Sequence, residues 1–455
     1  MPNQLNRSNN QNVDCQNDES SKELIDKVVP EIKPKDRYNL AYISFFVLGM
    51  TSCLPWLFFL NSQIYWKYKF RNTTLDKFES TNNTSSSKLQ NYFTAYLDTA
   101  SAVPYSVFVI VNIFMHKWIS WRIRVIITQL GIIMLFLVST IFVKINTDEW
   151  QHLFLKITLI TAAGLNALGS ILAGTIFGVV GHFPPKYISS CSQGLSSSGI
   201  LSTILQILSL WLSTGPIATG FMYFLIGLFI FLSSFFSYIF LEKQEFFKYY
   251  IKNKPVNKKS IYCDDDTTSS AENNSVSYMK ILFKIWPYGL SMFITFSATY
   301  GVFPAINTLV KSEAPSKTEW YQKYFGSVAT FLMFSIGDSS GCLLSRYSTW
   351  LIGKPGLVLT LSITRIIFIP IILVCNISDY PDKQLPIYIT NDFIYMGLMI
   401  LFSITHGYMW SALFVLIPRV VDSKEQEVSS SMLTAFLGVG CIAGAIMSFF
   451  YLTLL

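Results

Sequence analysis

Ionisable side chains inside long apolar stretches are the first candidates for chemistry in this sequence. Asp98, Asp338 and Arg365 all lie in such stretches, and an ionisable group in an apolar setting usually faces a cavity or a partner group. Asp338 has the small residues Gly337 and Ser339 beside it, and small neighbours let a helix or a ligand approach closely. We therefore expect Asp338 to line a path through the protein and to orient a ligand. The alternative is an interhelical hydrogen bond or ion pair that only fixes the packing of helices.

The other ionisable residues have different expected roles. Arg365 is expected to have a structural role and is a candidate for an ion pair. Its position near one end of its apolar stretch lets the long side chain reach the boundary with water. Asp98 is expected near the opposite boundary of the membrane. Contact with water there would account for a charged residue as well as a function would. Histidine is the side chain that changes charge most readily near neutral pH, so His406 is, together with Asp338, a candidate for proton coupling.

Flat and apolar side chains supply the walls of a predicted ligand site. Trp56 follows Pro55, and a proline inside a helix removes a hydrogen bond and bends the helix, which would turn the indole ring towards the interior. A similar bend is expected at Phe303 and Pro304. In the alternative interpretation these are ordinary core residues. The predicted substrate site comprises Trp56, Leu60, Phe303 and Pro304 as ring-stacking or apolar walls, Gly169 for the close approach of a helix, and Ser335 and Asp338 as polar groups.

The composition identifies the elements that must hold these residues. Of the 455 residues, 51% are hydrophobic and only 13% are charged, whereas a soluble domain carries about 25% charged residues. Such a chain is too apolar for a cytosolic enzyme, a nucleic-acid-binding protein or a disulfide-stapled secreted domain. The sequence contains no phosphate-binding loop, no nucleophile elbow and no cluster of metal ligands. We therefore expect a membrane protein that is not an enzyme and that uses no cofactor, no metal and no nucleic-acid partner.

Eleven apolar segments are long enough to cross a bilayer. About 20 helical residues span the hydrocarbon core, and only a helix satisfies its own backbone groups there within a single segment. We therefore expect an all-α polytopic membrane protein embedded in the lipid bilayer. The expected spans are 40–60, 95–114, 125–142, 153–180, 188–212, 220–240, 285–309, 325–344, 356–374, 394–417 and 432–454.

A long polar stretch divides these spans into six and five. We predict a cytoplasmic tail over residues 1–37, a first bundle of six spans over 38–241, a flexible cytoplasmic loop over 242–281 and a second bundle of five spans over 282–455. The tail and the loop are expected to be disordered, because they have little apolar surface to bury. Two bundles joined by a loop favour a major-facilitator-like transporter, in which the substrate passes between the bundles by alternating access.

The distribution of basic residues predicts the orientation in the membrane. With the amino terminus in the cytoplasm, the cytoplasmic segments hold 22 of the 34 lysine and arginine residues and the outer segments hold 11, in keeping with the usual excess of positive charge inside. The odd number of spans then places the carboxyl terminus outside. Asn72, Asn82 and Asn83 lie in sequons of the first outer loop, and we predict glycosylation there. The plasma membrane is the expected location, with an internal membrane as the alternative.

Several short motifs occur in a fixed order along the spans. They are Leu54-Pro55-Trp56, Asn166-Ala167, Phe177-Gly178, Ser192-Gln193-Gly194, Phe303-Pro304-Ala305, Phe368-Ile369-Pro370, Asn391-Asp392 and Gly407-Tyr408. In these motifs the chain resembles the equilibrative nucleoside transporter family, over nearly all of residues 40–455. The resemblance implies an inside amino terminus, large loops after the first and sixth spans, and passage of nucleosides or nucleobases between two helical bundles.

Four departures from that family fall at the expected ligand site. The family has an asparagine after the Pro-Trp pair, a glutamine in the fourth span, an arginine one turn after the eighth-span aspartate and an asparagine in the tenth span. This chain has Leu57, Ala173, Cys342 and His406 at these positions. In the family the aspartate and the arginine hold ribose and base, which implies that Asp338 acts here without its arginine. The alternative is that Arg365 or a nearby polar group replaces the missing arginine.

Three hypotheses about function follow from this resemblance and its departures. A more apolar pocket is expected to favour nucleobases or other ring compounds, with purines preferred, moved passively or together with protons. An Asp338 without an arginine neighbour is also suited to attract an organic cation. The third hypothesis is a scaffold or sensor without transport activity, against which the kinked helices and the aspartate at membrane depth argue.

Overall fold

The computed structural model describes residues 34–71, 88–115, 118–252, 278–377, 385–422 and 425–455. These residues are almost entirely helical, and their one extended pairing is an isolated bridge between Cys375 and Ile389. The predicted glycosylation sites Asn72, Asn82 and Asn83 lie outside the described residues. The same holds for most of the predicted tail and for most of the loop between the sixth and seventh spans.

Eleven helices in the described part of the chain are long and apolar enough to cross a membrane, as the sequence predicts. In chain order the spans are α2 (Leu40–Asn61), α4 (Lys88–Met115), α5 (Trp121–Lys144), α6 (Gln151–Val180), α7 (Pro185–Leu212), α8 (Pro216–Lys243), α10 (Tyr278–Val302), η4 (Gly326–Leu332) with α11 (Met333–Leu344), α12 (Pro355–Thr364) with η6 (Arg365–Ile367) and α13 (Phe368–Leu373), α14 (Asp392–Val420) and α15 (Gln426–Leu454). The shorter elements are η1 (Arg37–Asn39), α3 (Gln63–Lys69), α9 (Glu245–Lys252), η2 (Asn307–Leu309), η3 (Trp320–Tyr324) and η5 (Ser345–Leu351).

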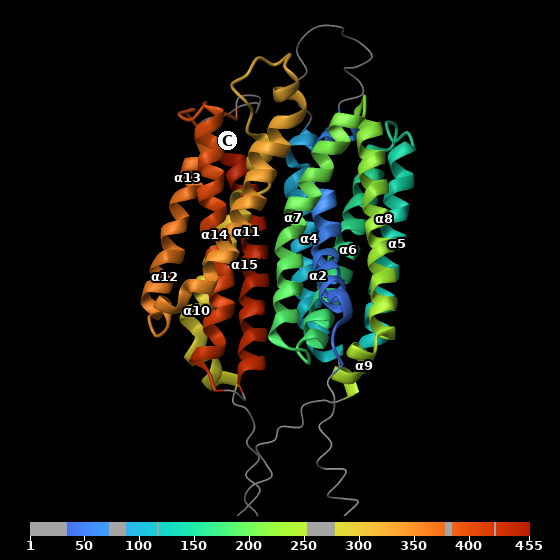
Figure 1. The fold of residues 1–455 in the computed structure, drawn as a ribbon. Coiled ribbons are helices and arrows are strands. Elements are labelled where there is room, and N and C mark those ends of the chain that lie inside the picture. The colour runs from blue at the N-terminus through green and yellow to red at the C-terminus, as the bar shows by residue number, and fades with distance from the viewer. Residues whose placement is uncertain (1–33, 72–87, 116–117, 253–277, 378–384, 423–424) are drawn as a thin grey trace, which may run out of the picture.

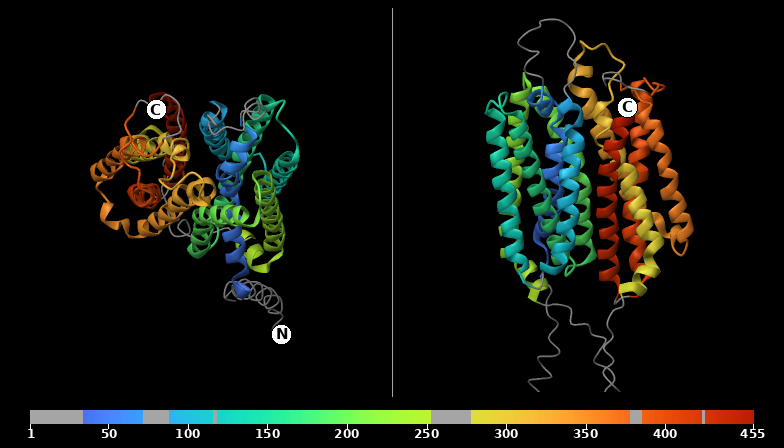
Figure 2. Two further views of the ribbon diagram at one scale, coloured as in Figure 1. Left: turned by 90° about the horizontal axis from the view of Figure 1, so that it is seen from above. Right: turned by 180° about the vertical axis from the view of Figure 1, so that it is seen from behind.

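The spans pack in two groups that stand side by side (Figures 1 and 2). In the first group α2 packs against α6, α7 and α8, and α5 lies against α6 and α8. In the second group α10 packs against α12, α14 and α15, and α11 runs along α14. The main contacts between the groups are those of α4 with α15 and of α7 with η4 and α11. We call these contacts the α4–α15 seam and the α7–α11 seam.

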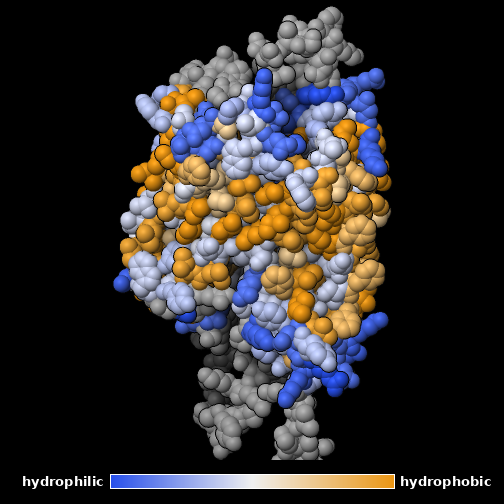
Figure 3. Space-filling view, turned by 45° about the horizontal axis from the view of Figure 1, so that its top comes forward, coloured by the Kyte–Doolittle hydropathy of each residue, from blue (hydrophilic) through white to orange (hydrophobic). Residues whose placement is uncertain are grey.

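The surface is suited to a lipid bilayer. On the face drawn in Figure 3, hydrophobic side chains form a broad band across the middle, and hydrophilic side chains gather towards its two ends. Large apolar side chains such as Ile160, Phe229 and Phe283 are more than 60% exposed, which water disfavours and lipid favours. The short helix α9 lies at one end of the molecule and the carboxyl terminus lies at the other (Figure 1).

Helices α2 and α7 approach each other through glycines. A Cβ atom on Gly49 would lie 2.1 Å from the carbonyl oxygen of Cys191, and one on Gly194 would lie 2.0 Å from that of Phe46. No side chain fits at these distances, so both positions need glycine for the two backbones to pack this closely. Since α2 also carries Trp56, this contact fixes where the indole ring stands.

The polar loop predicted over residues 242–281 is helical at its start. Residues 245–252 form α9, in which Phe246 and Phe247 are buried and contact the ring of Phe183. Apolar residues at positions 246, 247, 250 and 251 repeat at helical spacing and form one apolar face. This face packs on the first helix group, so residues 245–252 belong to that group and not to a flexible loop.

Two spans of the second group depart from a regular α-helix. The eighth span follows the π-helix η3 and begins as π-helix in η4 before it continues as α11. The ninth span is interrupted by the 3-10 turn η6 at Arg365. Irregular turns inside helices often mark functional sites. The seventh span also ends early, because α10 stops at Val302 and the chain turns at Phe303 and Pro304, where proline cannot continue the helical hydrogen bonds.

Candidate functional site

A cavity of about 1620 Å³ lies between the two helix groups. It is lined by residues of α2, α4, α6 and α7 from the first group and of α10, α11, α14 and α15 from the second. His182 and Ser192 line it at one end and are exposed. Towards the other end the lining reaches Leu60 and Phe303. The cavity therefore opens at the end of the molecule that carries α9.

The structure brings the predicted substrate site together around this cavity. Its lining includes Trp56, Leu60, Gly169, Phe303, Pro304, Ser335, Asp338 and His406. These residues come from α2, α6, α11, α14 and the turn after α10, so positions far apart in the sequence meet in one space. Their roles towards a ligand stay predictions.

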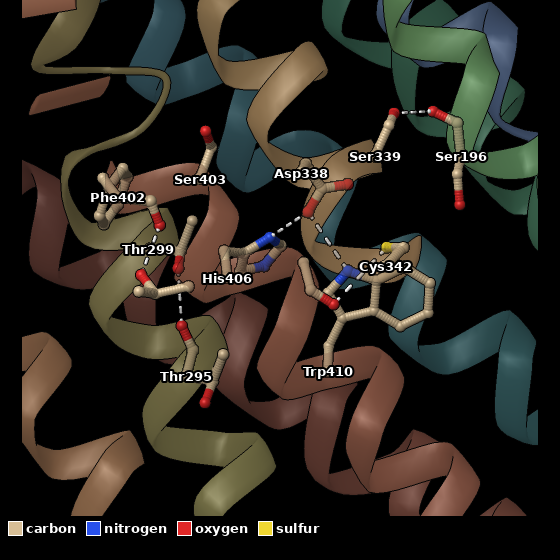
Figure 4. Close-up of polar contacts among 12 residues, drawn as sticks. Ser196, Thr295, Thr299, Asp338, Ser339, Cys342, Phe402, Ser403, His406 and Trp410 are labelled. Carbon is tan, nitrogen blue, oxygen red and sulfur yellow. Dashed lines mark hydrogen bonds and ion pairs between the residues drawn. The ribbon is translucent and has the colours of Figure 1, made fainter. Parts of the chain in front are cut away.

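The carboxyl group of Asp338 is a polar centre of the cavity wall (Figure 4). Its Oδ1 atom lies 2.8 Å from Nδ1 of His406 and accepts a hydrogen bond from Nε1 of Trp410 at 3.3 Å. A carboxylate oxygen only accepts, so an ionised Asp338 requires the proton on Nδ1 of His406. The Oδ2 atom makes no hydrogen bond with the described residues, and the Asp338 side chain is 20% exposed. This second oxygen is therefore free to bind a ligand.

Trp410 is the member of this cluster that the sequence analysis missed. His406 and Trp410 lie four residues apart on α14, so their side chains project from one face of that helix; this spacing is the signal that points to both. Cys342, which stands where the resemblance implies an arginine, contacts the carbonyl oxygen of Gly407 at 3.6 Å instead of Asp338. The donors to Asp338 therefore come from the neighbouring helix rather than from the next turn of its own.

Glycines hold α11 and α14 close enough for this contact. A Cβ atom on Gly407 would lie 2.0 Å from the carbonyl oxygen of Asp338, and one on Gly341 would lie 2.2 Å from that of Ile404. Both neighbours are backbone atoms, so neither can move aside without a shift of the whole helix. These two positions thus fix how Asp338 faces α14.

Aromatic rings form the wall next to this carboxyl group. Phe303 and Phe334 stack face to face with ring centroids 3.8 Å apart, and Phe331 meets Phe303 edge-on at 5.8 Å. Trp56 of α2 packs against the same apolar cluster. A flat apolar surface beside a carboxylate suits a planar ring that carries N–H or hydroxyl donors.

The two helix groups are joined directly beside Asp338. The Oγ atom of Ser339 donates a hydrogen bond to the carbonyl oxygen of Ser196 on α7 at 2.8 Å (Figure 4). One turn earlier on α11, Ser335 lies so close to Gly199 of α7 that an added Cβ would come within 2.7 Å of its Oγ. The α7–α11 seam is therefore closed next to the candidate site, and a movement of the groups would alter the site.

Gly169 lies where α6 packs on α2. A Cβ atom there would lie 2.7 Å from the carbonyl oxygen of Ser52, so this position needs glycine for helix packing. Gly169 also lines the cavity. The structure thus gives the residue a packing role, and its predicted contact with a ligand stays a prediction.

Burial corrects the expectations for Arg365 and Asp98. Arg365 is 2% exposed and does not reach the boundary with water. Its guanidinium donates to the carbonyl oxygen of Phe402 at 3.0 Å and to the hydroxyl of Thr299 at 2.8 Å. It also donates to the hydroxyl of Thr405. These partners are neutral oxygens, where the sequence suggested an ion pair. Asp98 is 0% exposed, so the expected contact with water is wrong.

Replacing Arg365 by lysine is expected to lower the melting temperature of the purified protein. A lysine ammonium cannot match the fixed fork of a guanidinium, and each buried acceptor left without a donor costs about 1–3 kcal/mol. Thermal denaturation in detergent measures the effect. Arg419→Lys on the same second helix group is the matched control, because Arg419 is exposed and its replacement should leave the melting temperature unchanged. Equal melting temperatures for Arg365→Lys and the wild type would contradict the structural role of Arg365.

Comparison with known proteins identifies the family of this chain. A family model described as nucleoside transporter matches residues 159–453, which is more than half of the chain. The chain belongs to the nucleoside transporter family. Membership in this family makes the protein a transporter and not an enzyme, as the sequence predicts.

Curated relatives match almost the whole chain. Equilibrative nucleoside transporter 2 of Rattus norvegicus is 28% identical over 456 residues, covering 93% of this chain and 99% of that protein. Equilibrative nucleoside transporter 1 of Homo sapiens is 27% identical over 453 residues, covering 92% and 98%. The resemblance to the equilibrative nucleoside transporter family is thereby confirmed.

A solved structure also has this fold. A bacterial homologue of the human lysosomal transporter Spinster, in an inward-facing and occupied conformation, aligns with a TM-score of 0.51 and 14% identity, covering 91% of this chain and 81% of that one. At this identity the likeness shows the fold alone. The expected all-α fold with a major-facilitator-like arrangement is confirmed.

Proposed function

We propose that this member of the nucleoside transporter family moves nucleosides and nucleobases, with purines preferred, by alternating access through the cavity between its helix groups. The observation that carries the proposal is the free Oδ2 atom of Asp338, which faces a cavity walled by stacked aromatic rings. The relatives named above are nucleoside transporters, which supports the class of substrate. The fold supports alternating access, because two helix groups enclose the cavity.

In the proposed binding mode the base lies against the aromatic wall. Trp56 contacts the ring from the first helix group and Phe303 from the second, while Leu60 and Pro304 close the apolar side of the site. The Oδ2 atom of Asp338 accepts a hydrogen bond from a base N–H or a ribose hydroxyl, and bonds to a charged acceptor are among the stronger ones. A substrate that contacts both helix groups favours the conformation in which the two groups close around it.

The donors around Asp338 support recognition of the base more than of the sugar. Cys342 replaces the arginine that the resemblance implies, and His406 and Trp410 occupy only Oδ1. The described residues around this carboxyl group thus present one free acceptor and a broad apolar surface. Such a site gains more from a large flat ring than from sugar hydroxyls. We therefore include nucleobases among the substrates and place purines above the smaller pyrimidines.

The same contacts weaken the case for an organic cation. The sequence argument for a cation depended on an unpaired Asp338. In the structure this carboxylate has two donors on α14, His406 and Trp410. A ring compound with N–H donors needs only the remaining oxygen, so it fits the site better than a full positive charge.

We also propose that the protein lies in the plasma membrane with its amino terminus in the cytoplasm. The excess of lysine and arginine in the segments on that side supports this orientation. The cavity opens at the end that carries α9, so in this conformation it would face the cytoplasm. The sequons at Asn72, Asn82 and Asn83 would then lie outside the cell, where glycosylation takes place.

Competition for uptake tests the proposed substrates. In cells that carry the protein, uptake of labelled adenosine is expected to saturate and to be inhibited by unlabelled adenosine and hypoxanthine. Uridine should inhibit less strongly, and tetraethylammonium should not inhibit. Cells without the protein give the background. Inhibition by tetraethylammonium but by neither purine would overturn the proposal in favour of a cation transporter.

A further inference from the structure

Asp98 is a buried carboxyl group that the proposed substrate site does not use. It lies on α4 in a row with Ser101, Ala102 and Tyr105, all of which line the cavity. Residues spaced by three, four and seven positions share one face of a helix. Asp98 therefore belongs to the face of α4 that is turned towards the cavity and the second helix group.

The carboxyl group of Asp98 has no hydrogen-bond partner in the described part of the chain. The residue is 0% exposed, and neither of its oxygen atoms is accessible or accepts a hydrogen bond. An ionised carboxylate buried without a partner is destabilised by several kcal/mol. A proton on one oxygen removes this charge, and it needs no additional space in an occluded position.

The titratable groups near Asp98 do not supply a positive charge. Tyr105 of α4, Tyr300 of α10 and Cys441 of α15 line the same cavity, and the electrostatic interactions of Tyr300 and Cys441 include Asp98. Phenol and thiol groups are neutral or negative, so none of them compensates a carboxylate.

Neighbouring helices of the first group add no charge beside Asp98 either. Cys53 of α2 lines the cavity and is a thiol. The titratable side chains of α6, which packs along α4, are His152 and Lys156; both are exposed near the start of that helix. Among the described residues that line the cavity, Asp338 is the other carboxyl group, and its Oδ1 atom has two donors.

The place of Asp98 ties its exposure to the movement of the helix groups. Helix α4 belongs to the first group and packs on α15 of the second. Alternating access moves the groups against each other, so the α4–α15 seam that is closed here must loosen at another stage. Asp98 is then occluded in one state and hydrated in another. A group whose surroundings differ in this way binds a proton with different affinity in the two states, which is the condition for coupling.

We propose that Asp98 binds a proton that crosses the membrane together with the substrate, a role that rests on the proposed transport function. A hydronium ion on the proton-rich side transfers its proton to one oxygen of the Asp98 carboxylate while the α4–α15 seam is open. The seam closes on the neutral carboxylic acid. The proton passes to water when the seam opens on the other side. No other bond forms or breaks, and the proton gradient supplies the energy.

Accumulation in liposomes tests this role. Purified wild-type protein, with the lumen at pH 7.5 and the outside at pH 6.5, is expected to concentrate labelled adenosine up to about tenfold, because one pH unit is a tenfold difference in proton activity. Without the pH gradient it should only equilibrate the label. Asp98→Asn, which has the shape of the neutral acid, is expected to equilibrate adenosine without concentrating it. Asp98→Glu keeps a carboxyl group and should still concentrate it.

Asp422→Asn is the matched control for this experiment. It makes the same chemical change on an exposed carboxylate that pairs with Lys284 at 3.3 Å, and exposed pairs contribute little. This variant should concentrate adenosine as the wild type does. A loss of accumulation in Asp422→Asn as well would overturn a specific role of Asp98.

Three outcomes separate a failure of this proposal from a failure of the transport function. Wild-type protein that equilibrates adenosine but never concentrates it, or Asp98→Asn that concentrates it normally, would overturn the role of Asp98 alone. Wild-type protein that takes up no adenosine under either condition would contradict the transport function itself. A pH-sensitive dye in the lumen gives a measurement without any variant: wild-type uptake should acidify the lumen, and unchanged pH would overturn the proposal.

Discussion

Asparagine in place of Asp338 is expected to lower kcat/KM for nucleoside uptake by about 10- to 100-fold, the effect of losing one hydrogen bond to a charged acceptor of about 1.5–3 kcal/mol. The amide oxygen can still accept from Nε1 of Trp410, so the contact with α14 is retained in part. The other side of the amide presents an N–H donor where Oδ2 accepts. A substrate N–H or hydroxyl then meets a donor and loses its partner.

The control for this variant is Ser340→Ala. Ser340 lies on the same helix as Asp338, is partly exposed, and donates to the carbonyl oxygen of Ile336 within its own helix. Initial rates of labelled adenosine uptake, corrected for the amount of folded protein, compare the two variants with the wild type. Full activity of Asp338→Asn would show that Asp338 fixes helix packing alone, which is the alternative stated from the sequence.

Alanine in place of Gly407 is expected to destabilise the second helix group and to abolish most uptake. The added Cβ would lie 2.0 Å from the carbonyl oxygen of Asp338 and 2.7 Å from its carbonyl carbon. Backbone atoms cannot turn aside, so α14 must move away from α11. Overpacking of this kind typically costs about 1–3 kcal/mol, and here it also separates His406 from the carboxyl group that it contacts.

Gly397→Ala is the matched control on the same helix. A Cβ atom at Gly397 has no other atom within 4 Å, and alanine favours a helix over glycine. The melting temperature in detergent and the uptake of adenosine should be lower than wild type for Gly407→Ala and unchanged for Gly397→Ala. The same melting temperature for both variants would contradict the close packing of α11 on α14.

Hydropathy was enough to predict the eleven spans. Each span is a local property of about 20 residues, so no knowledge of tertiary contacts is needed to place it. Asp338 could also be found, since a carboxyl group among apolar residues is unusual on composition alone. Its partners could not be found in the same way, because the contact with His406 and Trp410 depends on how α11 and α14 are rotated against each other.

Burial was the property that sequence position predicted poorly. Asp98 follows the start of its helix by only a few turns and was expected to meet water, yet it is fully buried beside the α4–α15 seam. Arg365 was expected to reach the membrane boundary, yet it is enclosed by α10 and α14. Residues 245–252 were expected to belong to a flexible polar loop, yet they form α9, whose apolar face includes Phe246 and Phe247. In all three places, tertiary packing decides what a local pattern leaves open.

Counterflow in liposomes tests the central claim most directly. Purified protein is placed in liposomes loaded with unlabelled adenosine, and labelled adenosine is added outside at low concentration and equal pH. In a transporter that alternates between two states, the binding site should return to the outward-facing state faster when internal substrate is bound. The labelled adenosine should therefore rise transiently above equilibrium in loaded liposomes and not in empty ones. Entry that is equally fast in loaded and empty liposomes, or that never saturates, would contradict alternating access through this cavity.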